Sequence, residues 1–434
     1  MMNRPQPPMP ACTPVAIVIG IALTLAGPEA APAATAFVGR VPADWPPDVE
    51  APVCIPCPPG FTVPSPLNLS LVVESQDGRK TCPGMLEVAD AASAEGPRLW
   101  FLWTATRQCA GKPIRVTIGD AAANGPRPAN PYVSKISDPQ FHLATAAGDP
   151  VYSYWHGKPA PGQRYPLTDF IHPLIGLDGE VLTWLSPRDH VHHRGIFWAW
   201  VRHEMEGKPV GSWWQPDTIH LEPGRLAAGD SPVLSIMSAR HDWVYTPKGQ
   251  DQGRPFVSEQ VICRTFRTTA DGRAIDIDIT LTALADGVRI GGTTDLGKGY
   301  GGFTFRYGST TDRKVSQAAI VMDGKDTPED LLTVHAKWGD WSAIFKMPDG
   351  NPARARSGAA VFVHPSHPEY PPEWLTRYYG VLNVSYPDLK MIDLPRDKPL
   401  RLKYRVWVHR GGAQEGRCDE HYRAYAADFG WKAG

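Results

Sequence analysis

The residues from 169 to 203 concentrate histidine more than any other part of the chain. Five of the 14 His residues stand in the run DFIHPLIGLDGEVLTWLSPRDHVHHRGIFWAWVRH, where Asp189 and Arg194 bracket the densest part. Imidazole titrates near neutral pH and has only an intermediate tendency to be buried, so no core needs so many. The run therefore predicts a site for ligand binding, metal binding or proton transfer.

Three kinds of site are open for the central HVHHR sequence. If residues 189–194 form a strand, His190 and His192 point to one face and His193 to the other. Two imidazoles on one face are a recurring metal-binding geometry, so a divalent metal on His190 and His192 is one hypothesis. Hydrogen bonding to a polar substrate, with Arg194 on a carboxylate, is the second. A buried polar network that only orders the loop is the third.

Residues elsewhere in the chain add acid, base and cation chemistry. Glu259 stands in a strand-like run, and a partly buried carboxylate there can act as a general base. Trp198, Trp200, Trp213 and Trp214 are candidates for a wall that stacks on sugar rings, with core packing as the alternative. We predict one pocket, with His190, His192, His193 and Glu259 as catalytic residues, and Arg194, His172, Trp213, Arg306, His364 and Arg377 binding the substrate. His364 and Glu259 are also candidates for a third metal ligand.

The composition predicts a soluble protein built of strands. With 44 basic and 45 acidic residues among 434, the chain carries no charge excess that favours nucleic acid or an anionic membrane surface as partner. Its 45 Pro and 41 Gly divide the sequence into short elements, which favours strands and turns over long helices. The 15 Trp are typical of sugar stacking and interfaces. We therefore expect an all-β binding scaffold.

The first 36 residues have the pattern of a signal peptide. Arg4 gives a positive start, residues 15–26 are apolar, and Ala34 to Ala36 resemble a cleavage site. A membrane anchor is the alternative, but the apolar run is shorter than the roughly 20 residues that span a bilayer. We expect export to the periplasm or the extracellular space, with no membrane span after signal removal.

Export changes what the cysteines imply. Six Cys remain after residue 36, four of them before residue 110, and an oxidising compartment favours disulfides over a zinc site at their irregular spacing. We predict a disulfide-stapled, sandwich-like β module at 37–120 and a linker at 121–130, where Pro, Gly and Asn dominate. A larger β-sandwich follows at 131–434, with many alternating runs and one short C-terminal helix at 419–429.

Several motifs resemble those of a known family. His172-Pro173-Leu174, Asp189-His190 and His192-His193-Arg194-Gly195 are similar to the signature of exported bacterial proteins described as a domain of unknown function or as methane-oxygenase-PmoA-like. The resemblance spans about residues 139–408. Further matches are Glu259, Gly301-Gly302-Phe303 with Arg306, Lys337-Trp338-Gly339, His364-Pro365, and Trp374 with Arg377-Tyr378-Tyr379-Gly380. The chain departs from the pattern at His367, where Asn is usual, and at Leu375, where His is usual.

Three functions follow from these features. The first is an exported carbohydrate-active enzyme, a hydrolase, lyase or epimerase, that acts on a polar or anionic glycan on a sandwich resembling galactose-mutarotase-like supersandwiches. The second is a non-catalytic glycan-binding or cell-surface protein. The third is a metal-dependent oxygenase, which the family label implies, although membrane methane oxygenases carry several spanning helices and this chain shows none beyond the signal. A glycan or another polar small molecule is the expected partner.

Overall fold

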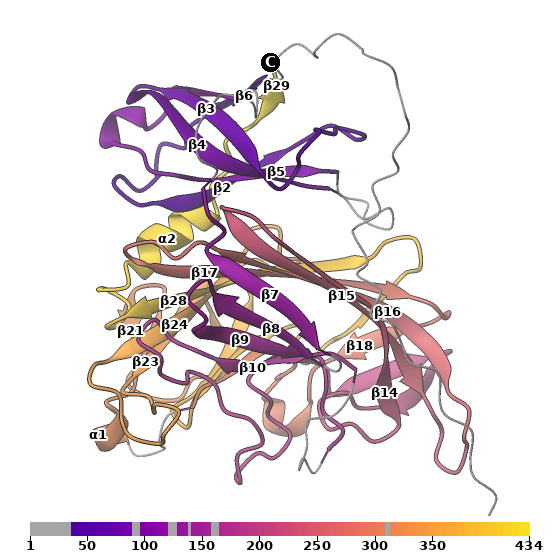
Figure 1. Ribbon diagram of the computed structural model, residues 1–434. Coiled ribbons are helices and arrows are strands. Elements are labelled where there is room, and N and C mark those ends of the chain that lie inside the picture. The colour runs from indigo at the N-terminus through magenta and orange to yellow at the C-terminus, as the bar shows by residue number, and fades with distance from the viewer. Residues whose placement is uncertain (1–35, 89–95, 120–127, 138–139, 158–164, 309–312) are drawn as a thin grey trace, which may run out of the picture. The chain divides into compact units, whose positions relative to one another are not determined.

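The regular secondary structure of the described residues is almost all β, in antiparallel sheets. The computed structural model describes residues 36–88, 96–119, 128–137, 140–157, 165–308 and 313–434 (Figure 1). Strands account for 51% of the chain and helices for 5%, so the predicted all-β class is confirmed. The predicted signal peptide, except for its last residue, and most of the predicted linker lie outside the described residues.

The N-terminal residues form a single seven-stranded antiparallel sheet in the order β2-β5-β4-β3-β6-β1-β29. Its strands are β1 (Ala36–Arg40), β2 (Ala51–Pro56), β3 (Leu69–Ser75), β4 (Gly78–Glu87), β5 (Arg98–Trp103), β6 (Pro113–Gly119) and β29 (Lys432–Ala433). A 3-10 turn, η1 (Arg107–Cys109), lies between β5 and β6.

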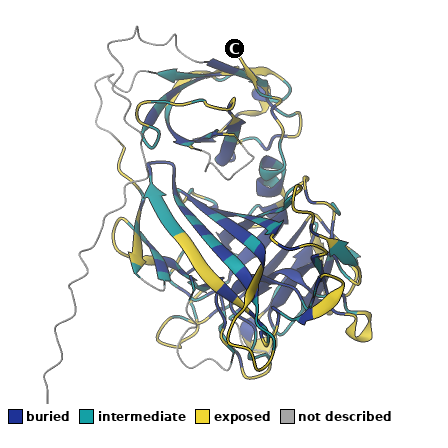
Figure 2. Cartoon of the chain, turned by 90° about the vertical axis from the view of Figure 1, so that its right-hand side faces the viewer, coloured by how far each residue is buried: buried dark blue, intermediate teal, exposed yellow. Residues whose placement is uncertain are grey.

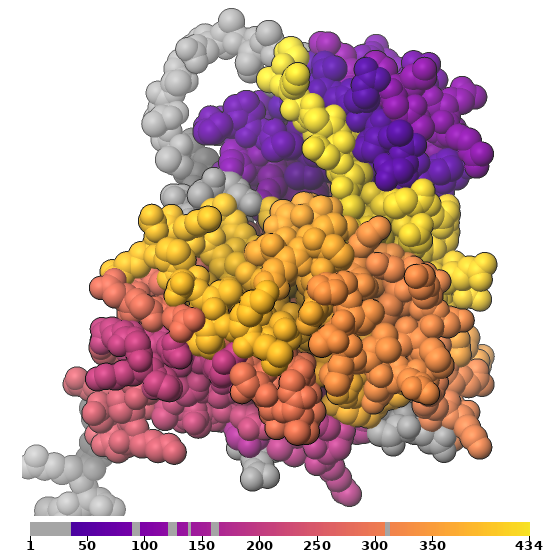
Figure 3. Space-filling model, turned by 180° about the vertical axis from the view of Figure 1, so that it is seen from behind, coloured from indigo at the N-terminus to yellow at the C-terminus, as the bar shows by residue number. Residues whose placement is uncertain are grey.

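The last of these strands comes from the other end of the chain. In β29, Lys432 and Ala433 pair with Val38 and Phe37 of β1, and Figure 3 shows the yellow C-terminal segment running over the indigo N-terminal strands. Phe429 packs against Trp45 and Trp103, with ring centroids 5.1 and 6.2 Å away, in the core of this sheet. The core of the N-terminal sheet is therefore completed by the C-terminus.

Two nine-stranded antiparallel sheets form the sandwich of the larger part. One runs β22-β25-β26-β19-β11-β10-β9-β8-β7, with β7 (Tyr132–Ser137), β8 (Gln140–Thr145), β9 (Pro150–Trp155), β10 (Phe170–Leu174), β11 (Ile196–Ala199), β19 (Gly302–Arg306), β22 (Val334–His335), β25 (Glu373–Arg377) and β26 (Val381–Ser385). The other runs β14-β15-β16-β17-β28-β24-β23-β20-β21, with β14 (Ile219–Asp230), β15 (Leu234–Tyr245), β16 (Arg254–Phe266), β17 (Gly272–Ala283), β20 (Ala319–Met322), β21 (Lys325–Asp326), β23 (Trp338–Ala343), β24 (Ser357–Val363) and β28 (Leu400–Arg410).

A small sheet and short helices complete the larger part. The four-stranded sheet β13-β12-β18-β27 consists of β12 (Arg202–Met205), β13 (Lys208–Gly211), β18 (Arg289–Gly291) and β27 (Met391–Asp393). The helices are η2 (Asp295–Gly297), α1 (Arg313–Ser316) and α2 (Cys418–Tyr425). The predicted C-terminal helix exists but ends four residues earlier than expected. No helix among the described residues has the length and apolar character needed to cross a bilayer.

The main core lies between the two nine-stranded sheets. Strand β15 alternates buried and partly exposed positions, so Met237, Ala239, His241 and Trp243 share its inner face (Figure 2). This follows from the two-residue period of a strand, which sends neighbouring side chains to opposite faces. The same alternation in β16 turns Glu259 inward, between apolar neighbours on the same face. The core thus contains several polar side chains that need partners.

The expected disulfide staple is not found among the described residues. All six of their cysteines are free thiols. Cys54 packs with the core on one face of the N-terminal sheet, whereas Cys57, Cys82 and Cys109 belong to the core on the other face. Cys57 instead donates to the Ile55 carbonyl at 3.6 Å. The sheet therefore separates Cys54 from the other three cysteines, and the sequence spacing does not reveal this separation.

Truncating Phe429 should destabilise the N-terminal sheet. The ring is 5% exposed and lies among aromatic side chains, so Phe429→Ala leaves a cavity that costs about 3–5 kcal/mol of unfolding free energy. Denaturant unfolding followed by Trp fluorescence measures this loss. Leu296→Ala is the control, because Leu296 is 81% exposed and its loss should cost less than about 0.5 kcal/mol. Equal stability of the two variants would contradict this packing of the C-terminus.

Candidate functional site

The central histidine sequence forms two successive turns, which we call the histidine loop (residues 186–195). The amide of His190 donates to the Pro187 carbonyl at 3.1 Å, and the amide of His193 donates to the His190 carbonyl at 2.9 Å. The loop closes where the Ser186 amide donates to the His193 carbonyl at 2.8 Å. Residues 189–194 therefore do not form a strand, the condition under which His190 and His192 would share one face, because these short-range bonds replace a strand ladder.

Gly195 holds the end of the histidine loop against β10. Its φ of 66° lies in the left-handed region, and a Cβ there would lie 2.2 Å from the carbonyl oxygen of Ile171. Only glycine fits so close an approach. Strand β11 begins directly after it, so the loop is fixed to two neighbouring strands of one sheet.

The turns bring all three imidazoles together. The ring centroid of His190 lies 4.7 Å from that of His193 and 5.8 Å from that of His192, and the His192 and His193 centroids are 4.7 Å apart. Trp214 borders His193 at 5.9 Å, and Gln215 Nε2 lies 3.3 Å from His192 Nδ1. A strand would place these rings on two faces, whereas the two turns gather them into one cluster.

An ion pair anchors the outer edge of this cluster. His190 Nδ1 lies 2.9 Å from Asp189 Oδ2, and Arg306 Nη2 donates to both oxygens of Asp189 at 3.1 and 3.0 Å. The Tyr379 ring stacks on His190 at 4.7 Å, and the Arg306 guanidinium lies 4.8 Å from the centre of the same ring. Arg306 is fully buried, while the His190 side chain is 34% exposed. Asp189 thus connects the buried guanidinium of Arg306 to the partly exposed imidazole of His190.

The electrostatics of the cluster favour neutral His192 and His193 beside an ionised Asp189. Burial, together with nearby positive charge, lowers the pKa of His192 to about 4 and holds that of His193 well below its usual value. Burial alone would raise the pKa of Asp189, but the hydrogen bond from His190 and the charge of Arg306 outweigh it, and the pKa is lowered. At neutral pH the uncharged rings of His192 and His193 therefore lie beside the ionised Asp189.

Arg194 points from the histidine loop into the sandwich. Its guanidinium lies 4.7 Å from the ring centre of Phe197 and 4.8 Å from that of Trp213, and it is fully buried. Nη2 donates to the Trp213 carbonyl at 3.4 Å, while Nε and Nη1 have no hydrogen-bond partner in the described structure. Because a buried cation needs an opposite charge, its surroundings must supply one.

That charge comes from two carboxyl groups between the sheets, Asp169 before β10 and Glu259 in β16. The indoles of Trp198 and Trp243 donate to the two oxygens of Glu259, the second at 2.5 Å. Tyr154 donates its hydroxyl to Asp169 Oδ1, also at 2.5 Å. Both carboxyl groups are fully buried, and Asp169 Oδ2 has no other hydrogen-bond partner among the described residues, so a protonated Glu259 can donate to it. We call Asp169 and Glu259 the carboxyl pair.

The carboxyl pair holds one proton near neutral pH. Burial raises the pKa of Asp169 to about 6 and that of Glu259 well above its ordinary value, and the negative charge of Asp169 raises the pKa of Glu259 further. Glu259 is therefore the protonated donor and Asp169 the carboxylate. Burial lowers the pKa of Arg194 to about 9, and the negative charge of the pair counters that effect. The result is a buried unit of one anion and one cation.

Glu259 consequently does not line the surface of the histidine loop. Its side chain is fully buried and both oxygens accept indole N–H groups, so a substrate at the loop has no path to it in this structure. Glu259 is linked to the imidazole cluster electrostatically, through the charge of Arg194. Glu259 therefore does not share one pocket with the imidazoles, contrary to the prediction from the sequence. The site has two layers instead, with the imidazoles in the outer layer and the carboxyl pair in the inner layer.

Two further predicted residues lie beside or under the loop. His172 of β10 contacts Thr183 Oγ1 through Nδ1 at 2.9 Å, and burial lowers its pKa to about 4. Trp213 is fully buried under Arg194. Trp198 and Trp200 are also fully buried, and Trp214 is 5% exposed. Of the two interpretations of these tryptophans, the structure therefore supports core packing over a stacking wall, because all four rings belong to the main core.

Arg377 is near the cluster, but His364 is not part of it. Arg377 donates to the carbonyls of Leu331 and Thr376 at 3.0 and 2.8 Å, and its charge, like that of Arg306, acts on Tyr379. His364 lines a separate cavity of about 190 Å³ whose charged lining includes Arg264, Asp278 and Lys403. The predicted convergence of His364 with the imidazoles is thus wrong, because the loop that follows β24 places the His364 side chain at this separate cavity.

The imidazoles of the loop do not form a ready metal site in this arrangement. Among the described residues, the groups with three or more potential ligand atoms within 4.8 Å of one another are Asp169–His241–Glu259 and Asp340–His409–Cys418. Neither includes His190 or His192. The first group overlaps the carboxyl pair, whose oxygens already accept indole and phenol donors.

Sequence reasoning missed Asp169 and His241 as members of the site. Asp169 is the first residue of the histidine-rich run. No spacing pattern in the sequence links it to Glu259, which lies 90 residues further along the chain. His241 had a usable signal, because it stands at an inward position of an alternating strand between Ala239 and Trp243. An imidazole at such a position requires a polar core partner, and Asp169 Oδ1 lies 3.9 Å from its Nδ1.

Fold and site together define a class: a two-sheet antiparallel β-sandwich protein with a histidine loop over a buried carboxyl pair. A model of the family of unknown function DUF6807 matches residues 143–423. This range covers most of both nine-stranded sheets and includes the histidine loop and the carboxyl pair. The chain therefore belongs to that family. No curated protein matches the chain.

Asp169→Asn should weaken the pH dependence of stability. A carboxyl whose pKa is raised on folding binds protons more tightly in the folded state, so its contribution is complete below the unfolded value near 3.9 and is lost as pH rises through about 6. Wild-type unfolding free energy should fall over this window by on the order of 2 kcal/mol from this group. Asn suits the positive φ of 59° at this position.

Denaturant unfolding between pH 4 and 8 measures the difference. Asp251→Asn, at an exposed position, is the control and should keep the wild-type pH dependence. If Asp169→Asn and wild type lost the same unfolding free energy over this window, Asp169 would not have the raised pKa.

Proposed function

We propose that this chain is an exported carbohydrate-active enzyme that acts on a polar or anionic glycan by proton-transfer chemistry at the histidine loop. The observation that supports this most is the Asp189–His190 pair, held by buried Arg306 at a partly exposed position. Export rests on the pattern of residues 1–36 alone. Hydrolase, lyase and epimerase reactions all require a group that accepts or donates a proton, which is the role we assign to His190.

The Asp189–His190 pair is suited to move a proton. A carboxylate at Nδ1 favours the tautomer with hydrogen on that nitrogen, which leaves the Nε2 lone pair free to accept a proton from a bound molecule. No described residue donates to or accepts from Nε2 of His190. The carboxylate also stabilises the imidazolium that forms. Arg306 keeps Asp189 ionised and fixes its direction, since one guanidinium nitrogen contacts both oxygens.

The surrounding groups fit a polar ligand. His192, which is partly exposed, is held neutral, so its ring has one donor and one acceptor, as sugar hydroxyl groups require, whereas neutral His193 is buried. Gln215, exposed beside His192, adds an amide. Tyr379 and Tyr300 are partly exposed aromatic rings near the cluster, and Tyr300 contacts Trp214 at 4.9 Å. Aromatic faces beside hydrogen-bonding groups are typical of sugar-binding surfaces.

His190→Gln should remove turnover while leaving binding. Gln keeps a polar side chain of similar length but cannot take up a proton, so kcat should fall about 10²–10⁴-fold on whichever neutral or acidic oligosaccharide wild type converts. Product formation over a panel of such oligosaccharides, with KM for the best one, measures both effects. His220→Gln, at an exposed position on β14, is the matched control and should keep wild-type kcat. A variant at 190 with unchanged kcat would rule out His190 as the proton carrier.

A glycan-binding protein without catalysis is the second candidate, favoured by the neutral His192 and His193. In that case wild type binds an oligosaccharide but forms no product, and His190→Gln weakens binding alone. The metal-dependent oxygenase that the methane-oxygenase-PmoA-like resemblance implies is distinguished by elemental analysis. It requires iron or copper that is lost in a His190→Gln, His192→Gln double variant.

A further inference from the structure

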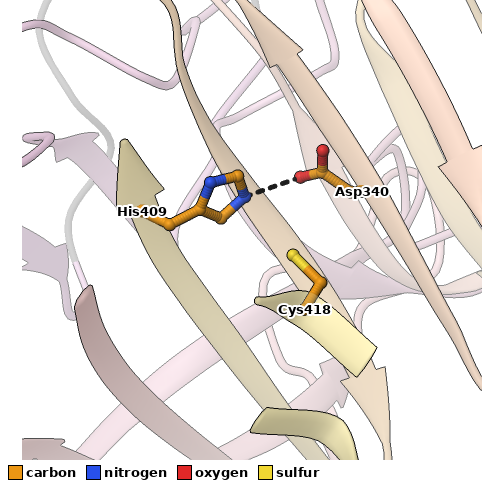
Figure 4. A group of neighbouring side chains, drawn as sticks. All are labelled: Asp340, His409 and Cys418. Carbon is orange, nitrogen blue, oxygen red and sulfur yellow. Dashed lines mark hydrogen bonds and ion pairs between the residues drawn. The ribbon is translucent and has the colours of Figure 1, made fainter. Parts of the chain in front are cut away.

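A second cluster of chemically active side chains lies away from the histidine loop. Figure 4 shows Asp340 of β23, His409 of β28 and Cys418, the first residue of α2, turned toward one another. His409 Nε2 lies 3.0 Å from Asp340 Oδ1, and the Cys418 thiol faces the same imidazole (Figure 4). All three side chains are completely buried, and their ligand atoms lie within 4.8 Å of one another.

The strands leave room for this cluster at a glycine. Ser342 of β23 pairs with Gly358 of β24, which pairs in turn with His409 of β28. A Cβ on Gly358 would lie 2.7 Å from Cε1 and 2.9 Å from Nε2 of His409, and 2.9 Å from the Ser342 Cβ. The missing side chain therefore creates the space in which the imidazole nitrogen meets its neighbours.

The hydrogen bonds of His409 orient Nε2 toward the cluster. Nδ1 lies 3.1 Å from the Arg410 carbonyl oxygen, which only accepts, so the hydrogen of a neutral ring belongs on Nδ1. Nε2 lies 3.0 Å from the Asp340 carboxylate, which only accepts, so without a metal a proton lies between the two atoms, in the place that a metal ion would take. A histidine that donates one ring N–H to a backbone carbonyl and presents the other nitrogen inward has the usual orientation of a metal ligand.

Two more oxygen atoms in this region have no hydrogen-bond partner in the described structure. They are Asp340 Oδ2 and Ser342 Oγ, both completely buried. Asp340 and Ser342 stand two residues apart on β23 and so share a face of the strand. A buried carboxylate oxygen without a partner is costly, which indicates that the polar group in this place is incomplete.

We propose that Asp340, His409 and Cys418 bind a divalent metal ion of the zinc class. A carboxylate, an imidazole and a thiolate are all zinc ligands, and ligand atoms of a tetrahedral zinc site lie roughly 3.3–3.8 Å apart, given bonds of about 2.0–2.3 Å. Small side-chain rotations bring the three atoms to such spacings. The fourth position is left for a water molecule or the Ser342 hydroxyl. The site is independent of the function proposed for the histidine loop.

The alternative chemistry of these residues is a nucleophile, a base and a carboxylate. Complete burial of all three closes that arrangement to a substrate, so a structural metal fits the location better. Such an ion would tie the start of α2 to β23 and β28. The binding step also balances: the thiol proton of Cys418 and the proton shared by His409 and Asp340 leave to solvent as the cation enters.

Metal analysis of the full-length chain tests this site. Protein purified from zinc-supplemented medium should contain one equivalent of zinc by elemental analysis, and Cys418→Ser and Asp340→Asn should each lose at least half of it. Cys109→Ser is the matched control, a buried cysteine of the N-terminal sheet, and should keep the wild-type content. The His190→Gln, His192→Gln double variant should also keep it, which separates this site from the histidine loop.

Cobalt provides a second readout that does not depend on a variant folding. Wild type refolded with Co²⁺ in place of zinc should show thiolate-to-cobalt charge-transfer absorption, together with the visible bands of tetrahedral cobalt. Zinc should also raise the wild-type Tm in proportion to the logarithm of its concentration. Absence of the thiolate band in wild type, or zinc content that is unchanged in folded Cys418→Ser, would overturn the proposal.

Discussion

The carboxyl pair is the interaction on which the larger part of the molecule depends. Asp169 directly precedes β10 of one nine-stranded sheet, and Glu259 lies in β16 of the other. The proton that they share therefore joins the two layers. The indole of Trp198 comes from the first sheet and that of Trp243 from the second. Because an unpaired charge in such a core is costly, both layers must be in register for the pair to be satisfied.

This constraint extends to the surface through Arg194. Its guanidinium balances the negative charge of the carboxyl pair, while its backbone is part of the histidine loop. Gly195, pressed against Ile171, fixes the direction in which the loop leaves the sheet. The imidazoles therefore sit on a support that is determined by the core. A buried charge network that positions an accessible Asp–His pair gives the loop the rigidity that the proposed proton transfer requires.

The sequence predicted the strands better than it predicted the site. Alternating runs such as residues 275–281 reveal strands because burial follows a period of two, and the HHR motif correctly indicated a cluster of imidazoles. The loop conformation was not predictable from the strand pattern, because Pro187 and Gly195 impose turns on a run that also alternates. The predicted positions of Trp213 and His364 are wrong, because the type of a residue reveals neither how deeply it is buried nor which loops come together in the fold. Asp169 depended on a contact across 90 residues that no local pattern encodes.

A neutron crystal structure of the deuterium-exchanged protein at pH 7 tests the central claim most directly, since it locates the protons of the carboxyl pair. The arrangement described here predicts one deuteron between Asp169 and Glu259, bonded to Glu259, with a fully protonated Arg194 guanidinium nearby. Two bare carboxylates, or a deuteron on each carboxyl group, would contradict the claim that one shared proton and one buried cation hold the two sheets together.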